Sequence, residues 1–244
     1  MAKPSFLKWI VTSIFCLSYI CAFSQVQDDF SDGNFTQNPV WSGTQNSFTV
    51  NAAKQLQINA TAAGEAYLST PNTKIKFTEW IFYVRLAFSP SSGNFVRVYL
   101  TSDKSDLSSS LKGYYIQLGE AGNADGIDLF KQDSFSHTKL IDGKAGTITR
   151  TNNTVRVKVT RDDVGNWILY SDTLGGNNFN VEGNVLDNSF ASTKYFGVYA
   201  KFTSTNATKI YWDDFLVQQT KADTTPPKLI AAEAISATQL LLTF

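Results

Sequence analysis

Cysteine is scarce in this sequence. The 244 residues include two cysteines, and both lie within the first 24 positions. From residue 25 onward there is no thiol for a disulfide, a thiolate metal site or a cysteine nucleophile. Aromatic residues make up 14% of the chain, so a core large enough to be stable without disulfides can form.

Histidine is scarcer still, because His137 is its single occurrence. This excludes histidine-rich metal sites and makes any serine–histidine dyad depend on one residue. His137 stands in the polar stretch "SFSHTKL", so we expect a solvated surface side chain. Enzyme classes that rely on histidine are therefore not indicated.

An excess of charge of either sign is also absent. The chain has 21 basic and 21 acidic residues, and two of the lysines fall within the first 24 positions. The remainder therefore carries a net charge of about minus two. Neither a nucleic acid nor an anionic membrane is predicted as a partner.

An apolar run near the amino terminus is too short for a good membrane-spanning helix and is typical of a secretory signal. Two lysines precede residues 9–23, and Ala22 and Ser24 place small residues three and one positions before the expected cleavage point. We therefore expect residues 1–24 to be a signal peptide and the mature chain, without a transmembrane segment, to be secreted. Cys21 raises the alternative of lipoprotein processing, but bulky residues precede it where small ones are required.

The remaining sequence alternates between apolar and polar residues and shows no apolar stripe at helical spacing. Clear examples are "EWIFYVRLAF", "NFVRVYLTSD", "GYYIQLGE", "TVRVKVTRDD" and "KIYWDDFLV", each bounded by turn-forming residues. At least ten strands of this kind predict an all-β domain over residues 25–219. We expect a two-sheet antiparallel β-sandwich.

A second boundary follows this domain. Pro226 and Pro227 in "TKADTTPPKL" cannot continue a paired strand, so residues 220–228 are predicted to be a linker. Residues 229–244 then form two strand-like runs around a turn. Two strands cannot bury a core alone, so we expect the chain to continue into downstream domains of a larger protein.

Five segments carry a resemblance to a known family: "DDFSDGNFTQNPVWSG", "WIFYVRLAFSPSSGNFVRVYL", "GYYIQLGEAG", "VRVKVTRDDVGNWILYSD" and "YWDDFLV". They resemble the amino-terminal domain of secreted, multidomain bacterial surface proteins. The resemblance implies a concanavalin A-like (laminin G/lectin-type) jelly roll, located at the cell surface of a Gram-negative bacterium. It also implies that the D-x-T-P-P motif at residues 223–227 opens an immunoglobulin-like domain. The fold serves lectins, adhesins, glycanases and lyases, so the function stays open.

Paired carboxylates for glycoside chemistry are poorly represented. Glycanases of this fold carry Glu-x-Asp-x-x-Glu on one strand, whereas "DGIDLFKQD" offers Asp125 and Asp128 without a glutamate. Glu120 stands alone in a glycine-rich loop. We therefore expect a non-catalytic domain, with a carbohydrate-active enzyme of the same fold as the alternative.

Strand alternation also predicts a polar and aromatic outer face. In "EWIFYVRLAF" it directs Trp80, Phe82 and Val84 toward the core and leaves the intervening side chains outside. If four consecutive strands are neighbours in one sheet, their outward residues combine aromatic rings with planar polar groups, as a sugar-binding face does. The alternative is an ordinary exposed sheet. The predicted ligand-binding residues are Tyr83, Arg85, Arg97, Tyr99, Tyr115, Gln117 and Asp128.

An Asp-Asp-Phe motif stands near each end of the predicted domain. Asp28 and Asp29 could join Asp214 around a structural calcium ion. We favour the alternative, in which these acids end strands at the seam where the first and last strands meet. Phe30, Trp212, Phe215 and Leu216 are then expected to close the core there.

The sequence therefore predicts an extracellular recognition or adhesion module, with a polysaccharide or other glycan as its expected ligand. No cofactor is expected apart from the calcium alternative. A purely structural spacer is the third hypothesis.

Overall fold

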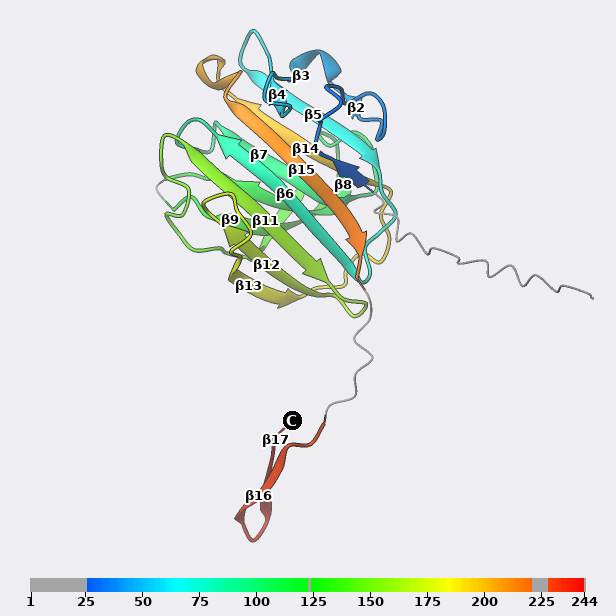
Figure 1. Ribbon diagram of the computed structural model, residues 1–244, viewed down its shortest axis with the longest axis vertical. Coiled ribbons are helices and arrows are strands. Elements are labelled where there is room, and N and C mark those ends of the chain that lie inside the picture. Colours follow the sequence, from blue (N-terminus) through cyan, green and yellow to red (C-terminus); the bar gives the residue numbers. More distant parts are fainter. Residues whose placement is uncertain (1–25, 123, 221–227, 244) are drawn as a thin grey trace, which may run out of the picture.

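The computed structural model describes residues 26–122, 124–220 and 228–243 (Figure 1). The predicted signal peptide and the two prolines of the predicted linker lie outside these residues. Nearly all regular structure is antiparallel strand, arranged in two large sheets and one separate hairpin. The prediction of an all-β, two-sheet sandwich is confirmed. No helix among the described residues is long and apolar enough to cross a membrane.

Sheet A has eight strands in the order β13-β12-β11-β6-β15-β4-β3, and β1 pairs with β15 beside this path. Its strands are β1 (Val26–Asp28), β3 (Phe48–Val50), β4 (Leu56–Ile58), β6 (Thr78–Leu86), β11 (Asn153–Arg161), β12 (Asn166–Asp172), β13 (Asn180–Leu186) and β15 (Ile210–Gln219).

Sheet B has seven strands in the order β10-β9-β8-β7-β14-β5-β2. They are β2 (Ser42–Gly43), β5 (Gly64–Pro71), β7 (Phe95–Ser102), β8 (Leu111–Leu118), β9 (Ile127–Ser134), β10 (Ser136–Ile141) and β14 (Tyr195–Phe202). Two single-turn 3₁₀ helices, η1 (Gln45–Ser47) and η2 (Ser204–Asn206), lie in connections.

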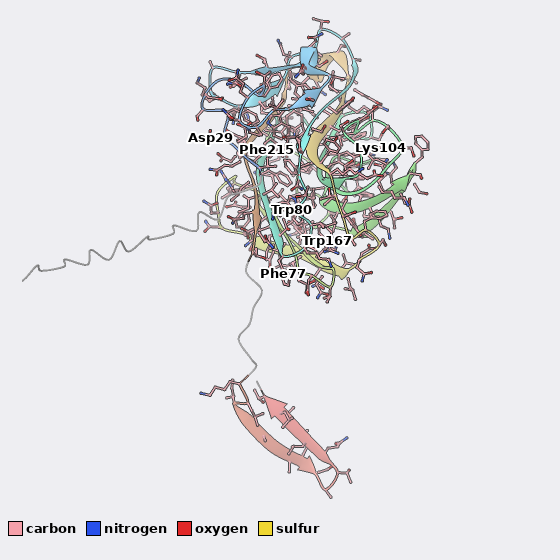
Figure 2. All side chains as sticks on the ribbon, turned by 90° about the vertical axis from the view of Figure 1, so that its right-hand side faces the viewer. Asp29, Phe77, Trp80, Lys104, Trp167 and Phe215 are labelled. Atoms are coloured by element: carbon pink, nitrogen blue, oxygen red, sulfur yellow. The ribbon has the colours of Figure 1, made fainter. Side chains whose placement is uncertain are left out.

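The core lies between the two sheets and is rich in tryptophan. Burial alternates strictly along β6 and β11, as the sequence pattern predicts. Trp80 stacks on Trp167 inside the sandwich, with ring centroids 5.5 Å apart (Figure 2). Each fully buried large apolar side chain stabilises the fold by roughly 1.5–3 kcal/mol, so no disulfide is needed.

The first and last strands of the sandwich lie side by side, as expected. Val26 pairs with Val217 and Asp28 with Phe215. Phe30 and Phe215 are buried in the core against each other, with their ring centroids 5.9 Å apart. Leu216 was wrongly expected in the core: it is half-buried, because the residue after inward-facing Phe215 points to the other side of the sheet.

The remaining two strands, β16 (Ala231–Ser236) and β17 (Gln239–Thr243), form a sheet of their own. Every residue of both strands is exposed. This hairpin therefore has no buried core among the described residues.

Candidate functional site

Three of the four strands predicted to form one outer face are indeed neighbours in sheet B. Arg97 on β7 lies opposite Gln117 on β8, and Gln117 lies opposite Asp128 on β9. Tyr99 lies opposite Tyr115 on the same strands. The outward side chains of β7, β8 and β9 therefore share one surface.

The fourth strand, β6, belongs to sheet A, so the predicted face is wrong in this part. Tyr83 pairs across to Arg156 and Asp213 within sheet A. The guanidinium of Arg85 lies 4.9 Å from the ring centroid of Tyr211, and its Nε donates to Asn152 Oδ1 at 3.0 Å. The chain crosses between sheets after β6, and alternation along a strand carries no information about this crossing.

Tyr99 and Tyr115 face away from the main core but are not exposed, which corrects a second expectation. Both are fully buried in a smaller apolar cluster on the outer side of sheet B. Leu107, from the loop between β7 and β8, belongs to the same cluster. This loop packs onto the sheet where Gly197 has no side chain, and a Cβ there would lie 2.7 Å from Leu107. A single leucine in the polar "SDKSDLSSS" is the only sequence signal of this cover.

Arg97 occupies the centre of the aromatic surface. Its guanidinium carbon lies 4.7 Å from the ring centroid of Tyr115, 5.0 Å from Phe95 and 5.5 Å from Tyr199. Arg97 Nε donates to Gln117 Oε1 at 2.9 Å. Such contacts hold the guanidinium plane by cation–π attraction and one directed hydrogen bond.

Phe130 extends this surface along β9. Its ring stacks parallel to that of Tyr115, with centroids 5.3 Å apart, and it remains half-exposed. Gln117 and Arg97 are half-exposed too. We call this surface the Arg97 platform; it comprises Phe95, Arg97, Tyr115, Gln117, Phe130 and Tyr199.

Electrostatics on the platform follow from burial and from the charge of Arg97. Burial raises the pKa of the Tyr99, Tyr115 and Tyr199 phenols, and the guanidinium opposes this rise at each of them. Tyr99 Oη donates to Gln132 Oε1 at 2.8 Å. The three phenols are therefore neutral at physiological pH.

His137 lies at the edge of the platform. His137 is exposed, as expected, but its Nδ1 lies 2.9 Å from Tyr115 Oη. Burial of the ring and the charge of Arg97 both lower the pKa of His137. Its hydrogen-bond partner is a tyrosine, so this contact is not a serine–histidine dyad.

Asp128, the last predicted ligand-binding residue in sheet B, is buried and already engaged. Its Oδ1 accepts from Gly143 N at 2.9 Å, and Lys139 Nζ lies 3.0 Å from its Oδ2. The same ammonium lies 3.0 Å from Glu120 and 2.6 Å from Asp142. Burial raises the pKa of Asp128, opposed by the Gly143 and Lys139 hydrogen bonds.

The residues considered for glycoside chemistry are thus tied to one lysine. Glu120 and Asp128 share the ammonium of Lys139, and Asp125 accepts from the backbone of Glu120 at 2.8 Å. A glycosidase needs one carboxylic acid and one carboxylate flanking the scissile bond. In the Lys139 cluster, which comprises Lys139, Glu120, Asp128 and Asp142, one ammonium binds all three carboxylates.

No protein-family model matches the sequence, and no curated protein matches it. Solved structures do match. The legume lectin-like domain from Entamoeba histolytica aligns with a TM-score of 0.56 and 13% identity, over 84% of this chain and 100% of that one. The exoplasmic/lumenal domain of VIP36, in its Ca²⁺/Man2-bound form, aligns with a TM-score of 0.55 and 14% identity, over 82% and 89%. The carbohydrate-binding module CBM66 from Bacillus subtilis aligns with a TM-score of 0.50 and 10% identity, over 73% and 94%.

The fold is a legume-lectin-like jelly roll. At these identities the likeness establishes the architecture and leaves the ligand open.

The aspartates of the two Asp-Asp-Phe motifs meet at the seam of this legume-lectin-like domain, beside a cavity of about 280 Å³. Asp28 accepts from Trp41 Nε1 at 2.8 Å and from Phe30 N at 2.9 Å, yet burial raises its pKa to about 6. Asp29 is exposed, and its side chain accepts from the backbone of a nearby serine. Asp214 forms an ion pair with Arg156.

A group of acids whose oxygens lie close enough to one another to share a metal ion occurs elsewhere in this domain. Within the described ranges, the one group of three acids whose oxygens lie within 4.8 Å of one another is Glu120, Asp128 and Asp142. Lys139 already supplies a positive charge to that group. The predicted calcium ligands Asp28, Asp29 and Asp214 do not form such a group.

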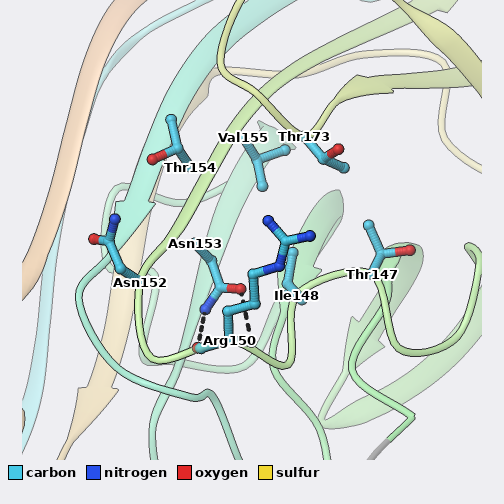
Figure 3. Close-up of a pocket in the computed structure, with 8 residues that line it drawn as sticks. All are labelled: Thr147, Ile148, Arg150, Asn152, Asn153, Thr154, Val155 and Thr173. Carbon is cyan, nitrogen blue, oxygen red and sulfur yellow. Dashed lines mark hydrogen bonds between the residues drawn. The ribbon is translucent and has the colours of Figure 1, made fainter.

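A polar pocket at the start of β11 was not predicted from the sequence (Figure 3). Its volume of about 40 Å³ suits a water molecule or two and excludes a sugar ring. Buried Asn153 organises it by donating to Phe88 O at 3.0 Å and accepting from Arg150 N at 3.1 Å. These hydrogen bonds hold the loop before β11 in place.

Proposed function

We propose that this domain is a non-catalytic carbohydrate-recognition module that binds glycans on the Arg97 platform. The single observation that carries the proposal is a partly exposed group of Phe130, Arg97 and Gln117 that is supported from beneath by buried aromatic rings. Aromatic faces pack against the C–H face of a pyranose, and planar polar groups bind its hydroxyls.

The comparisons support the same conclusion without assigning a ligand. Two of the aligned proteins are a carbohydrate-binding module and a lumenal domain with bound mannose units. We propose that the present domain shares this general role and acts outside the cell, after removal of residues 1–24. In this proposal the exposed hairpin opens an immunoglobulin-like domain of a larger protein on a Gram-negative cell surface.

Binding of the full chain to an array of neutral and acidic polysaccharides tests the proposal. Phe130→Ala removes the half-exposed ring of the platform, and we expect it to weaken binding about ten-fold or more, in line with the energy of one stacked ring. The matched control is Tyr170→Ala, because Tyr170 is a half-buried aromatic residue on the outer side of sheet A.

Unchanged binding in Phe130→Ala, or an equal loss in Tyr170→Ala, would place the ligand elsewhere. Binding to no polysaccharide would favour the spacer hypothesis. Release of sugar products that disappears in Glu120→Gln would show that the domain is an enzyme.

A further inference from the structure

Arg97 carries a positive charge that no acid of the described residues neutralises by an ion pair. Lys112, Lys131, Lys139, Arg156 and Lys201 each pair with a carboxylate within 4.0 Å. Arg97 instead lies among three aromatic rings, donates a hydrogen bond to Gln117 and also interacts with the Tyr99 phenol. Arg85 and Arg161 also have no ion pair within 4.0 Å among the described residues and are held by hydrogen bonds to an amide or to backbone carbonyls, but Arg97 is the one that lies among the rings of the platform.

The charge of Arg97 shifts the pKa values of the tyrosines and of the histidine that surround it. It opposes the rise in pKa that burial causes at Tyr99, Tyr115 and Tyr199, and it lowers the pKa of His137. Acids lie at two edges of the platform. Glu65 raises the pKa of Tyr199 and lies 3.5 Å from Lys201, and the Phe130 ring centroid lies 5.8 Å from Lys139 Nζ, which three carboxylates surround. Arg97 is the positive charge at the centre of the platform.

The orientation of Arg97 suits recognition of an oxyanion. Gln117 engages Nε, and the rings of Phe95, Tyr115 and Tyr199 surround the guanidinium plane. The guanidinium also interacts with the Tyr99 phenol, and guanidinium groups form a fork that binds carboxylates and sulfates in bidentate fashion. Neutral hydroxyls make weaker use of such a fork.

We infer that the Arg97 platform selects anionic sugars. Arg97 binds the carboxylate or sulfate group of the sugar, and Phe130 contacts the sugar ring that bears this group. This inference rests on the proposed function and narrows its ligand class. It assigns specificity to the guanidinium and general affinity to the aromatic rings.

Isothermal titration of the full chain with three soluble polymers tests the inference. The probes are polygalacturonate for carboxylates, dextran sulfate for sulfate esters and dextran as the neutral polymer. We expect the preferred anionic polymer to bind at least about ten-fold more tightly than dextran. The preference should shrink as the salt concentration rises, because screening weakens charge attraction.

The decisive variants are Arg97→Gln and Arg97→Lys. We expect Arg97→Gln to lose the preference for the anionic polymer and Arg97→Lys to retain only part of it, since an ammonium lacks the bidentate fork. The matched control is Arg85→Gln: Arg85 also lies over an aromatic ring and donates to an amide oxygen, but in sheet A. Its removal should leave the preference unchanged.

The outcomes separate this inference from the proposed function. Tight binding of dextran with no gain from charge, or an unchanged preference in Arg97→Gln, overturns the inference and leaves glycan binding intact. Binding of none of the three polymers, nor of any array glycan, overturns both. If Arg97→Gln melts at a much lower temperature than the parent, Arg97→Lys and the salt dependence decide the matter.

Discussion

Individual residues in this domain show how burial determines chemistry. Asp28 keeps two hydrogen-bond donors, from Trp41 and Phe30, and still has a pKa of about 6 because burial disfavours its charge more than the donors stabilise it. Asp213, on the outer side of β15, has a pKa raised to about 6, again chiefly by burial. Two carboxylates at one seam thus penalise the folded state when they ionise.

The stability of the domain should therefore fall as the pH rises from about 4 to about 6. The folded-state pKa of Asp28 exceeds its ordinary value of 3.8, so the folded state binds more protons than the unfolded state between about pH 4 and pH 6. We expect Asp28 alone to lower the free energy of unfolding by roughly 2–3 kcal/mol across that window. Urea denaturation at pH 4.5, 5.5 and 7 measures it.

Asp28→Asn should flatten this dependence, because an amide does not titrate, and Asp213 should account for part of the remaining slope. The amide replaces one acceptor oxygen, so a uniform loss of stability is expected beside the change in slope. An unchanged slope in Asp28→Asn would show that its carboxyl does not titrate there.

Gly197 is a second residue whose surroundings permit a sharp prediction. A Cβ at this position would lie 2.3 Å from Leu68 O and 2.7 Å from Leu107 Cδ1. Gly197→Ala should therefore destabilise the domain by about 2–4 kcal/mol through overpacking and displace the loop that carries Leu107. Thermal melting measures the loss. Gly64→Ala is the control, because a Cβ on Gly64 contacts nothing within 4 Å, and an equal loss there would refute the steric explanation.

At the scale of strands and loops, Lys139 connects segments that the sheet alone does not hold. It lies on β10 and binds Asp128 on β9, Glu120 before β9 and Asp142 after β10. Although burial works against it, hydrogen bonds to Asp142, Asp128 and Glu120 raise the pKa of Lys139. The edge of sheet B therefore depends on one ammonium among three carboxylates.

Removal of that ammonium should be costly. Lys139→Met leaves three carboxylates facing one another, and we expect a loss of about 2 kcal/mol or more at pH 7. The loss should be smaller at pH 5, because burial raises the pKa of Asp128 and removal of the opposing Lys139 charge raises it further. Lys112→Met is the matched control: Lys112 and Asp133 are exposed and 3.9 Å apart, so its loss should stay within about 0.5 kcal/mol. Equal losses for both variants would contradict the proposed role of the cluster.

Strands were predictable at this scale, but their grouping into sheets was not. Alternation correctly directed Trp80, Phe82 and Val84 inward, because a buried face imposes period-two spacing on the sequence. The same rule separates inward from outward side chains, but it does not show to which of the two sheets a strand belongs. The sequence therefore placed Tyr83 and Arg85 on the wrong face, because β6 pairs with distant β11 and β15 rather than with β7.

Cover by loops was equally hidden from the sequence. Tyr99 and Tyr115 point outward as predicted, yet both are fully buried. Their burial depends on a loop whose packing is set by three-dimensional contacts with Gly197 and neighbouring strands. Arg97 and Gln117 remained accessible and lie together, because a direct cross-strand pair joins them.

Considered as a whole molecule, the domain carries side-chain cations beside its main groups of acids. Arg156 pairs with Asp214 at the seam, and Lys139 stands inside the three-acid group. A divalent ion would have to displace these cations before it could bind. The calcium alternative thus competes with ion pairs already formed.

We therefore expect calcium to change the melting temperature of the full chain by less than about 2 °C, and EDTA to change it equally little. Differential scanning calorimetry with 1–10 mM calcium, as a rough range spanning weak extracellular sites, measures this. A large rise that Asp214→Asn abolishes would instead show a structural calcium ion at the seam.

The position of β15 has a consequence for how the domain is made. β15 lies between β6 and β4, and it also supplies the partner of β1. Until β15 has been synthesised, sheet A is divided into three unconnected parts (β13-β12-β11-β6, β4-β3 and β1), and Trp212 and Phe215 are missing from the core. Closure therefore depends on contacts between opposite ends of the chain, which form slowly. The two sheets can therefore close around the complete core only after the last strand of the domain has been made.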